Sequence, residues 1–308
     1  MEERGKGTLV SRRYVKSGKT ALSEYVNCKP EQRMKLLVDE GLTKYTMPKE
    51  RQKKKIQEER ETRWREKALH GKWAETTDET DPGTSQWLRT ANLKPVTEAL
   101  ITAAQDQALN TNWHAHHIIK NKPVDKCRAC NEYPETVEHI VSGCPRIAQT
   151  LYMKRHNAVA ATVHWGLCAN MGFERAEHWW QHQPETAMEN ESFKLLYDFN
   201  VMTDKKITAR RPDIIVVDKK NRHTTIIDVS CPADRNIKNK ETHKIEKYQD
   251  LKIELQRLWN TRIDIVPIVI GALGAITSNL EGYLLRLNTR DININQMQKQ
   301  SYCRLQIF

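Results

Sequence analysis

The sequence lacks any apolar run long enough to span a lipid bilayer. Its longest apolar stretch, residues 263–276, is interrupted by Asp264, Pro267, Gly271 and Gly274, so it favours a buried strand that leads into a turn. The first ten residues are charged and lack the apolar core of a secretory signal. These absences argue against a membrane-spanning or exported protein, and the seven cysteines are therefore expected to stay reduced inside the cell.

Acidic residues are too few to balance the basic ones. The 308 residues hold 50 Lys and Arg against 39 Asp and Glu, a net charge of +11, and no internal repeat or low-complexity tract. Residues 1–72 alone hold 20 basic and 11 acidic residues, so most of the surplus lies there. Such a surplus favours nucleic acid as a partner; the alternative is a solvated basic surface with no partner.

Three regions differ in their residue patterns. Residues 1–110 are polar and basic, and they predict a mostly helical region with a long exposed helix at 51–67 and a linker at 76–85. Residues 111–150 hold paired cysteines. Residues 151–308 alternate helical and strand patterns. They predict a small α/β domain, in which a central mixed sheet is flanked by helices.

Four potential metal ligands lie within 18 residues. Cys127 and Cys130 are followed by His139 and Cys144, which gives the spacing C-x2-C-x8-H-x4-C. Zinc favours four thiolate or imidazole ligands in a tetrahedron, and a two-residue gap lets both thiolates of a tight turn reach one ion. So short a segment cannot bury a core of its own, and the metal would supply its folding energy. The spacing therefore predicts a knuckle with structural Zn²⁺.

Two aspartates are expected to face each other across a hairpin. If the turn centres on residues 220–221, Asp213 lies opposite Asp228, and side chains in such pairs are about 5 Å apart. Two carboxylates at that distance repel each other unless a cation lies between them, and Mg²⁺ prefers oxygen ligands. The pattern predicts a catalytic Mg²⁺ held by Asp213 and Asp228.

A long amphipathic helix is expected at residues 241–259. Lys244 falls inside its apolar stripe and Lys247 on the margin. A lysine that faces paired aspartates can activate water or stabilise phosphate charge; alternatively, it extends from the first helical turn into solvent. We favour a catalytic role for Lys244, with Lys247 as the alternate.

These residues also carry a family resemblance. The segments RRPDIIVVDKK (210–220), IIDV (226–229) and K-x-x-K-Y (244–248) resemble the PD-(D/E)xK nuclease superfamily. More narrowly, the chain from about residue 50 is similar to the zinc knuckle and restriction-like endonuclease of site-specific non-LTR retrotransposons. Further similar stretches are KALHGKW (67–73), TEALITAAQDQAL (97–109), LLYDFNV (195–201), KIEKYQDLK (244–252) and VPIVIGALG (266–274).

The resemblance implies a restriction-endonuclease-like fold and a Mg²⁺-dependent enzyme that nicks target DNA for insertion. It also implies element RNA as a further partner, a nuclear location, and a reverse transcriptase domain upstream in a polyprotein, although this chain holds no reverse transcriptase core. Arg210 and Arg211 are candidate phosphate contacts, the alternative being a solvated pair, and Glu189 or Glu191 is a candidate for a further carboxylate. Ser230 stands where many of these nucleases have their lysine, so the lysine must come from the helix. The alternatives are an inactive nucleic-acid-binding remnant and a zinc-stapled protein-interaction module.

Overall fold

The computed structural model describes residues 49–78, 80–81, 84, 86–289 and 291–302. The chain divides into two compact units, residues 1–67 and residues 68–308. In the first, α4 (Lys49–Arg65) is a charged helix whose side chains are exposed along nearly its whole described length. Ion pairs one turn apart, such as Arg65 to Glu61 at 3.0 Å, stabilise such a helix modestly. The predictions for residues 1–48 lie outside the described residues.

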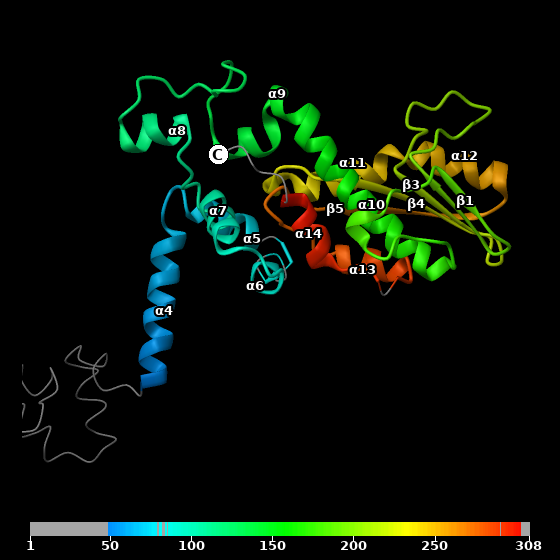
Figure 1. Cartoon of the computed structure of the whole chain (residues 1–308), viewed down its shortest axis with the longest axis horizontal. Coiled ribbons are helices and arrows are strands. Elements are labelled where there is room, and N and C mark those ends of the chain that lie inside the picture. The colour runs from blue at the N-terminus through cyan, green and yellow to red at the C-terminus, as the bar shows by residue number, and fades with distance from the viewer. Residues whose placement is uncertain (1–48, 79, 82–83, 85, 290, 303–308) are drawn as a thin grey trace, which may run out of the picture. The chain divides into compact units, whose positions relative to one another are not determined.

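The second unit holds the other helices that the structure describes (Figure 1). Before the sheet lie α5 (Gly71–Asp78), α6 (Trp87–Thr90), α7 (Pro95–Gln105), α8 (Asn112–His114), η3 (Ala115–Ile119), η4 (His139–Gly143), α9 (Pro145–Ile147), η5 (Ala148–Tyr152), α10 (Met153–Met171) and η6 (Trp179–Gln181). After the fourth strand lie η7 (Asp234–Asn236), α11 (Ile237–Lys247), α12 (Gln249–Trp259), α13 (Leu280–Arg286) and α14 (Ile294–Tyr302). None of the described helices is long and apolar enough to cross a membrane.

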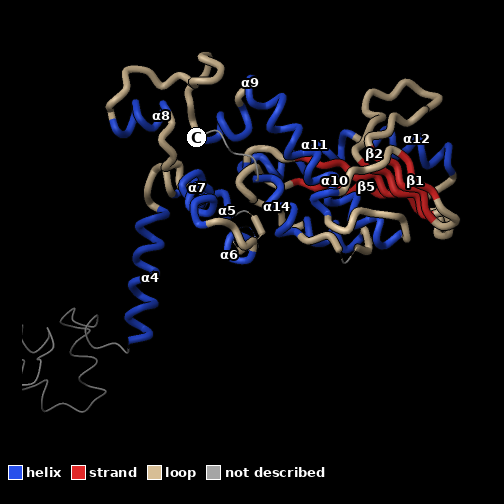
Figure 2. The backbone as a smooth tube through the Cα atoms, in the orientation of Figure 1, coloured by secondary structure: helices blue, strands red, loops and turns tan. Residues whose placement is uncertain are grey.

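This unit contains a mixed sheet (Figure 2). Its five strands are β1 (Ala187–Glu189), β2 (Phe193–Tyr197), β3 (Ile214–Asp218), β4 (His223–Ser230) and β5 (Arg262–Val269), and they lie side by side in sequence order. The first four pair antiparallel, whereas β5 runs parallel to β4. A parallel pair needs a long crossover, which α11 and α12 supply. The predicted α/β class with a helix-flanked mixed sheet is therefore confirmed.

Helices cover both faces of the sheet. Successive side chains of a strand point to opposite faces, and they pack into two separate cores. Ile214 and Ile227 belong to the core that contains α10, α13 and α14. Their neighbours Ile215 and Ile226 belong to the core that contains α12. The strands are apolar on both faces, and helices on both faces account for that pattern.

Two predicted segments differ in the structure. The expected continuous helix at 241–259 starts earlier and is broken at Tyr248, whose backbone (φ −104°, ψ 10°) separates α11 from α12. The expected linker at 76–85 is not a free connection. Thr84 is buried, and its Oγ1 atom accepts a hydrogen bond from Ile276 N at 3.1 Å. A contact 192 residues away along the chain was not visible in local turn propensity.

Candidate functional site

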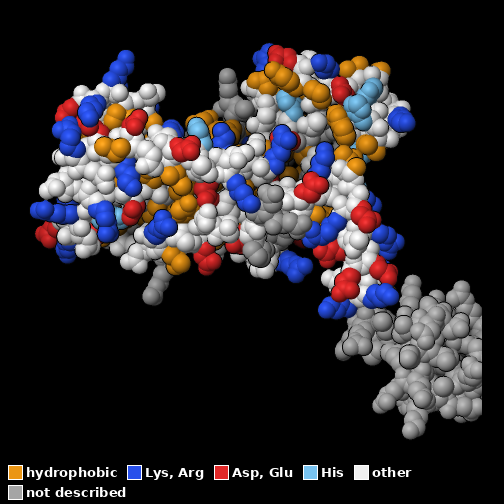
Figure 3. All heavy atoms as spheres, turned by 180° about the vertical axis from the view of Figure 1, so that it is seen from behind, with side chains coloured by type: hydrophobic (Ala, Val, Ile, Leu, Met, Phe, Trp, Pro, Cys, Tyr) orange, Lys and Arg blue, Asp and Glu red, His pale blue; other side chains and the backbone are white. Residues whose placement is uncertain are grey.

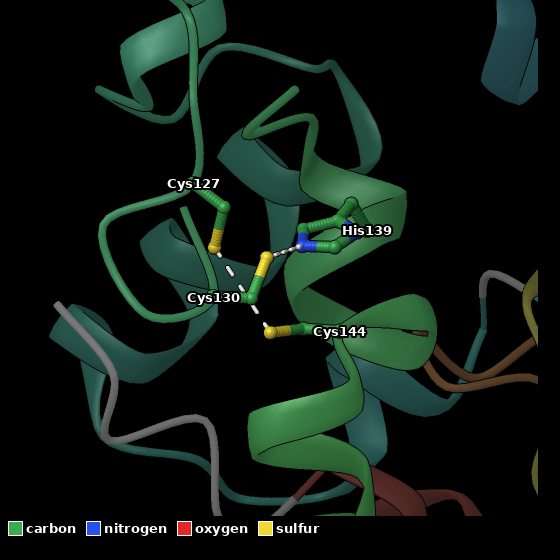
Figure 4. Close-up of side chains that lie close together, drawn as sticks. All are labelled: Cys127, Cys130, His139 and Cys144. Atoms are coloured by element: carbon green, nitrogen blue, oxygen red, sulfur yellow. Dashed lines mark hydrogen bonds between the residues drawn. The ribbon is translucent and has the colours of Figure 1, made fainter. Parts of the chain in front are cut away.

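The four predicted zinc ligands lie together in the second unit. Their ligand atoms are all within 4.8 Å of one another, and Figure 4 shows the side chains pointing toward a common centre. Cys127 Sγ lies 4.0 Å from Cys144 Sγ, and Cys130 Sγ lies 3.4 Å from His139 Nε2. The four side chains could therefore hold a metal ion such as zinc, which takes this ligand set in tetrahedral sites.

A short hairpin positions Cys127 and Cys130, the two ligands that are close together in the sequence. Cys127 N donates to Tyr133 O at 2.8 Å, and Asn131 N donates back to Cys127 O at 2.8 Å. Asn131 has a positive φ of 59°, a left-handed conformation that asparagine tolerates in tight turns. The other two ligands, His139 and Cys144, stand at the two ends of the turn η4, so its backbone fixes their separation.

A buried carboxylate anchors the hairpin. Glu135 is fully buried and accepts Asn112 N at 2.9 Å, Arg128 N at 2.7 Å and the Arg128 guanidinium at 2.6 Å. Burial alone would raise the pKa of Glu135, but the Arg128 pairing and these backbone donors lower it. The carboxylate therefore stays charged and joins the hairpin to α8.

The environment of the ligands differs from atom to atom. Burial raises the pKa of the Cys127 thiol, whereas backbone donors at Tyr133 and Glu132 lower that of Cys130. Burial also lowers the pKa of His139, which favours the neutral imidazole that binds metals. A metal ion is nevertheless needed to displace the thiol protons.

A second cluster forms around the two predicted aspartates. Strands β3 and β4 pair in the register expected from the sequence, with Ile214 opposite Ile227 and Asp218 opposite His223. Asp213 directly precedes β3, so the same register places it opposite Asp228. Its Oδ2 atom accepts a hydrogen bond from Val229 N at 2.6 Å. The two carboxylates thus lie at the same end of the hairpin.

Helix α11 brings both predicted lysines to Asp228. The Lys244 ammonium group forms an ion pair with Asp228 Oδ2, and Lys247 Nζ lies 3.6 Å from Asp228 Oδ1. Lys244 is the more enclosed, with 15% of its side chain exposed against 34% for Lys247. Tyr248 OH donates to Asp228 Oδ1 at 2.5 Å and accepts from Lys247 Nζ at 2.8 Å. Positions 244, 247 and 248 are spaced i, i+3 and i+4, which places them on one side of a helix, and all three side chains meet one carboxylate.

His156 was not predicted from the sequence. It comes from the first turn of α10, and its Nε2 atom lies 3.1 Å from Asp213 Oδ2. Burial alone would lower the pKa of His156 and raise that of Asp213, but their pairing shifts both the other way. The pair is therefore favoured in its charged form. The two residues are 57 positions apart, and no local motif links them.

The aspartates retain oxygen atoms that a cation could use. Asp228 Oδ2 is buried and accepts no hydrogen bond from the described residues, although the Lys244 ammonium lies beside it. A buried carboxylate oxygen without hydrogen bonds is costly unless positive charge compensates it. The hydrogen bonds of Asp213 from Val229 N and His156 both involve Oδ2. Carboxylate oxygens are the kind of ligand that hard cations prefer.

The remaining predicted residues lie at varied positions. Arg210 and Arg211 are exposed, and Arg211 pairs with Asp198 Oδ2 at 2.6 Å. Glu189 on β1 lies opposite Lys194 on β2, which in turn lies opposite Val217 near the end of β3. The Glu189 carboxylate also forms ion pairs with Lys194 and Lys219. It therefore lies toward the other end of β3 from Asp213, and the suggestion that it joins the aspartates is wrong.

No protein-family model matches this sequence, and no curated protein is similar enough to it to count as a relative. What the two clusters can do chemically is therefore inferred from their own geometry.

Proposed function

We propose that the protein is a Mg²⁺-dependent endonuclease that nicks DNA by phosphodiester hydrolysis. The observation that carries this proposal is the meeting of Asp213, Asp228 and Lys244 at one end of the β3–β4 hairpin. Paired carboxylates suit a divalent ion, and a lysine beside them suits phosphate chemistry. The basic surplus of the chain suits a polyanionic substrate.

Each side chain would have a separate task. Asp213 and Asp228 would hold Mg²⁺, which when bound supplies a Lewis acid that neutralises phosphate charge. Lys244 would orient the attacking water or stabilise the charge of the transition state, with Lys247 as the alternate. The contacts of Tyr248 with Asp228 and of His156 with Asp213 would fix the rotamers of the carboxylates, as supporting hydrogen bonds commonly do at metal sites.

The wider setting is part of the same proposal. Zn²⁺ would bind at Cys127, Cys130, His139 and Cys144 and hold the knuckle folded. Arg210 and Arg211 would contact phosphates; for Arg211 this means exchanging the exposed Asp198 for a phosphate. The resemblance supports a nuclear role in retrotransposon insertion, with element RNA as a further ligand and a reverse transcriptase domain as a partner.

Nicking of supercoiled plasmid in the presence of Mg²⁺ tests the activity. We expect Asp213→Asn to lose nicking at least about 100-fold, because metal ligands commonly contribute that much or more, while DNA affinity changes little. The matched control is Asp264→Asn, a half-buried carboxylate of β5 that pairs with His223; it should retain nicking. DNA binding by the wild type without Mg²⁺-dependent cleavage would instead select the inactive nucleic-acid-binding remnant.

A further inference from the structure

Outside both clusters, a further group of potential metal ligands lies between α10 and the segment that follows it. Its members are His164, Cys168 and His182, whose ligand atoms are all within 4.8 Å of one another. His164 and Cys168 are four residues apart on the helix, so they share one face. His182 follows η6 and comes from the segment that joins α10 to β1. Two segments of the chain therefore meet at this group.

His164 Nδ1 has two hydrogen-bonding neighbours, and it cannot bond fully to both. His164 Nδ1 lies 2.8 Å from His182 Nε2 and 3.5 Å from Cys168 Sγ. An imidazole nitrogen carries either one proton or one lone pair, so it can complete only one of these hydrogen bonds in full. A metal ion placed among the three atoms would bind all of them at once.

Burial prepares the three side chains as ligands. His164 and Cys168 are fully buried. Burial lowers the pKa of His164 to about 4 and also lowers that of His182, so both imidazoles keep a lone pair at neutral pH. Burial raises the pKa of Cys168 to about 11, so the thiol keeps its proton unless a cation displaces it.

We propose that His164, Cys168 and His182 form a second transition-metal site, distinct from the knuckle. Two imidazoles and one thiolate suit a borderline-soft ion such as Zn²⁺. Three protein ligands leave a fourth position for water, since His182 is partly exposed, or for the Met188 thioether, whose Sδ atom is 3.8 Å from Cys168 Sγ. On binding, Cys168 loses its proton to solvent and the imidazoles donate their lone pairs.

A metal ion at this site would link the segment that joins α10 to β1 to helix α10 itself. This segment carries Trp180, which is 62% exposed and stacks on His178 with ring centroids 4.3 Å apart. A metal bridge from His182 to α10 would hold this exposed aromatic surface in place. The site does not depend on the proposed nuclease activity, and its test requires no DNA.

The number of zinc ions retained by the full chain tests the proposal. The purified protein is saturated with Zn²⁺, passed through a desalting column and analysed by mass spectrometry of the metal. We expect two equivalents for the wild type and one for Cys168→Ser. His182→Ala, which alters a partly exposed side chain rather than the core, should also retain one and decides the matter if Cys168→Ser does not fold.

Two further variants separate this site from the knuckle. Cys130→Ser should retain one equivalent, and the double variant Cys130→Ser/Cys168→Ser none. Cys231→Ser, which alters another buried cysteine, should retain two. The proposal is overturned if Cys168→Ser and His182→Ala both hold as much zinc as the wild type. It is also overturned if the wild type holds a single equivalent that Cys130→Ser removes.

Discussion

At the scale of single residues, Asp228 stands out because three side chains of α11 and its C-terminal end contact it. Lys244, Lys247 and Tyr248 all reach its carboxylate, which has 3% of its surface exposed. Positive and donating neighbours compensate a buried carboxylate for the water that it has lost. The same positive neighbours also repel a cation, so Mg²⁺ would share Asp228 with Lys244 rather than replace it.

Lys244→Ala separates a catalytic role from phosphate binding. The nicking rate should fall about 100-fold or more, since positioned acid–base or charge-stabilising groups contribute on that order. DNA affinity should stay within about 2-fold, because one charge among 50 adds little to ground-state binding. Rates come from plasmid nicking and affinities from fluorescence anisotropy. Lys240→Ala, an exposed lysine on the same helix, is the matched control. Equal losses of affinity and rate in Lys244→Ala would identify a phosphate anchor instead.

His156 gives the molecule a pH-dependent contact. Its pKa is raised above 6.5 in the folded state by Asp213, so its contribution to stability is complete below pH 6.5 and is lost as pH rises through the folded value. The free energy of unfolding of the wild type should exceed that of His156→Gln by about 1 to 3 kcal/mol at pH 6. We expect that difference to shrink by pH 8, measured by urea denaturation. The difference isolates His156, because His164 and His182 are unchanged in both proteins. A difference that is constant between pH 6 and pH 8 would contradict the charged pair.

At the scale of elements, the knuckle and the sheet differ in what stabilises them. The hairpin around Cys127 has a buried carboxylate at Glu135 and few apolar side chains, whereas β3 and β4 lie between two apolar cores. A bound metal would therefore contribute more to the knuckle than to the sheet.

Cys130→Ser tests that difference. Hydrogen exchange of residues 126–144 should accelerate at least about 10-fold, because a structural zinc site supplies folding energy that the variant lacks. Exchange in β3 and β4 should change little, because their cores contain no knuckle residue. Cys231→Ser is the matched cysteine control and should leave the knuckle protected. Unchanged exchange at 126–144 would show that the hairpin folds without metal.

How far the sequence predicts the elements depends on how local their determinants are. The hairpin register followed from the polar turn between two apolar runs, and the spacing of the four Cys and His ligands followed from the chain itself. The break at Tyr248 did not, because the apolar periodicity continues through it, and the contact of the Tyr248 hydroxyl with Asp228 joins residues 20 positions apart. His156 was missed for the same reason: its partner Asp213 lies on another element.

At the scale of the whole molecule, charge is distributed unevenly along the chain. Residues 1–67 hold 19 basic and 11 acidic residues, whereas residues 68–308 hold 31 and 28. On the face drawn in Figure 3, basic and acidic side chains are interspersed. The second unit is thus nearly neutral overall, and sequence-independent attraction to DNA should come mainly from the first.

Deleting residues 1–67, which form the first unit, tests this division of charge. DNA binding should weaken, and its dependence on salt should flatten, because each lost phosphate contact removes about 0.9 from the slope of log affinity against log salt concentration. Replacing Lys53, Lys54 and Lys55 of α4 by Gln provides a version without truncation: glutamine retains helix propensity, so loss of charge is the main change. Its slope should fall by less than that of the deletion. Glu58→Gln, which removes the partner of Lys54, should leave the slope unchanged or raise it slightly. If neither the deletion nor the triple substitution alters the slope, α4 is a solvated helix and the second unit alone binds DNA.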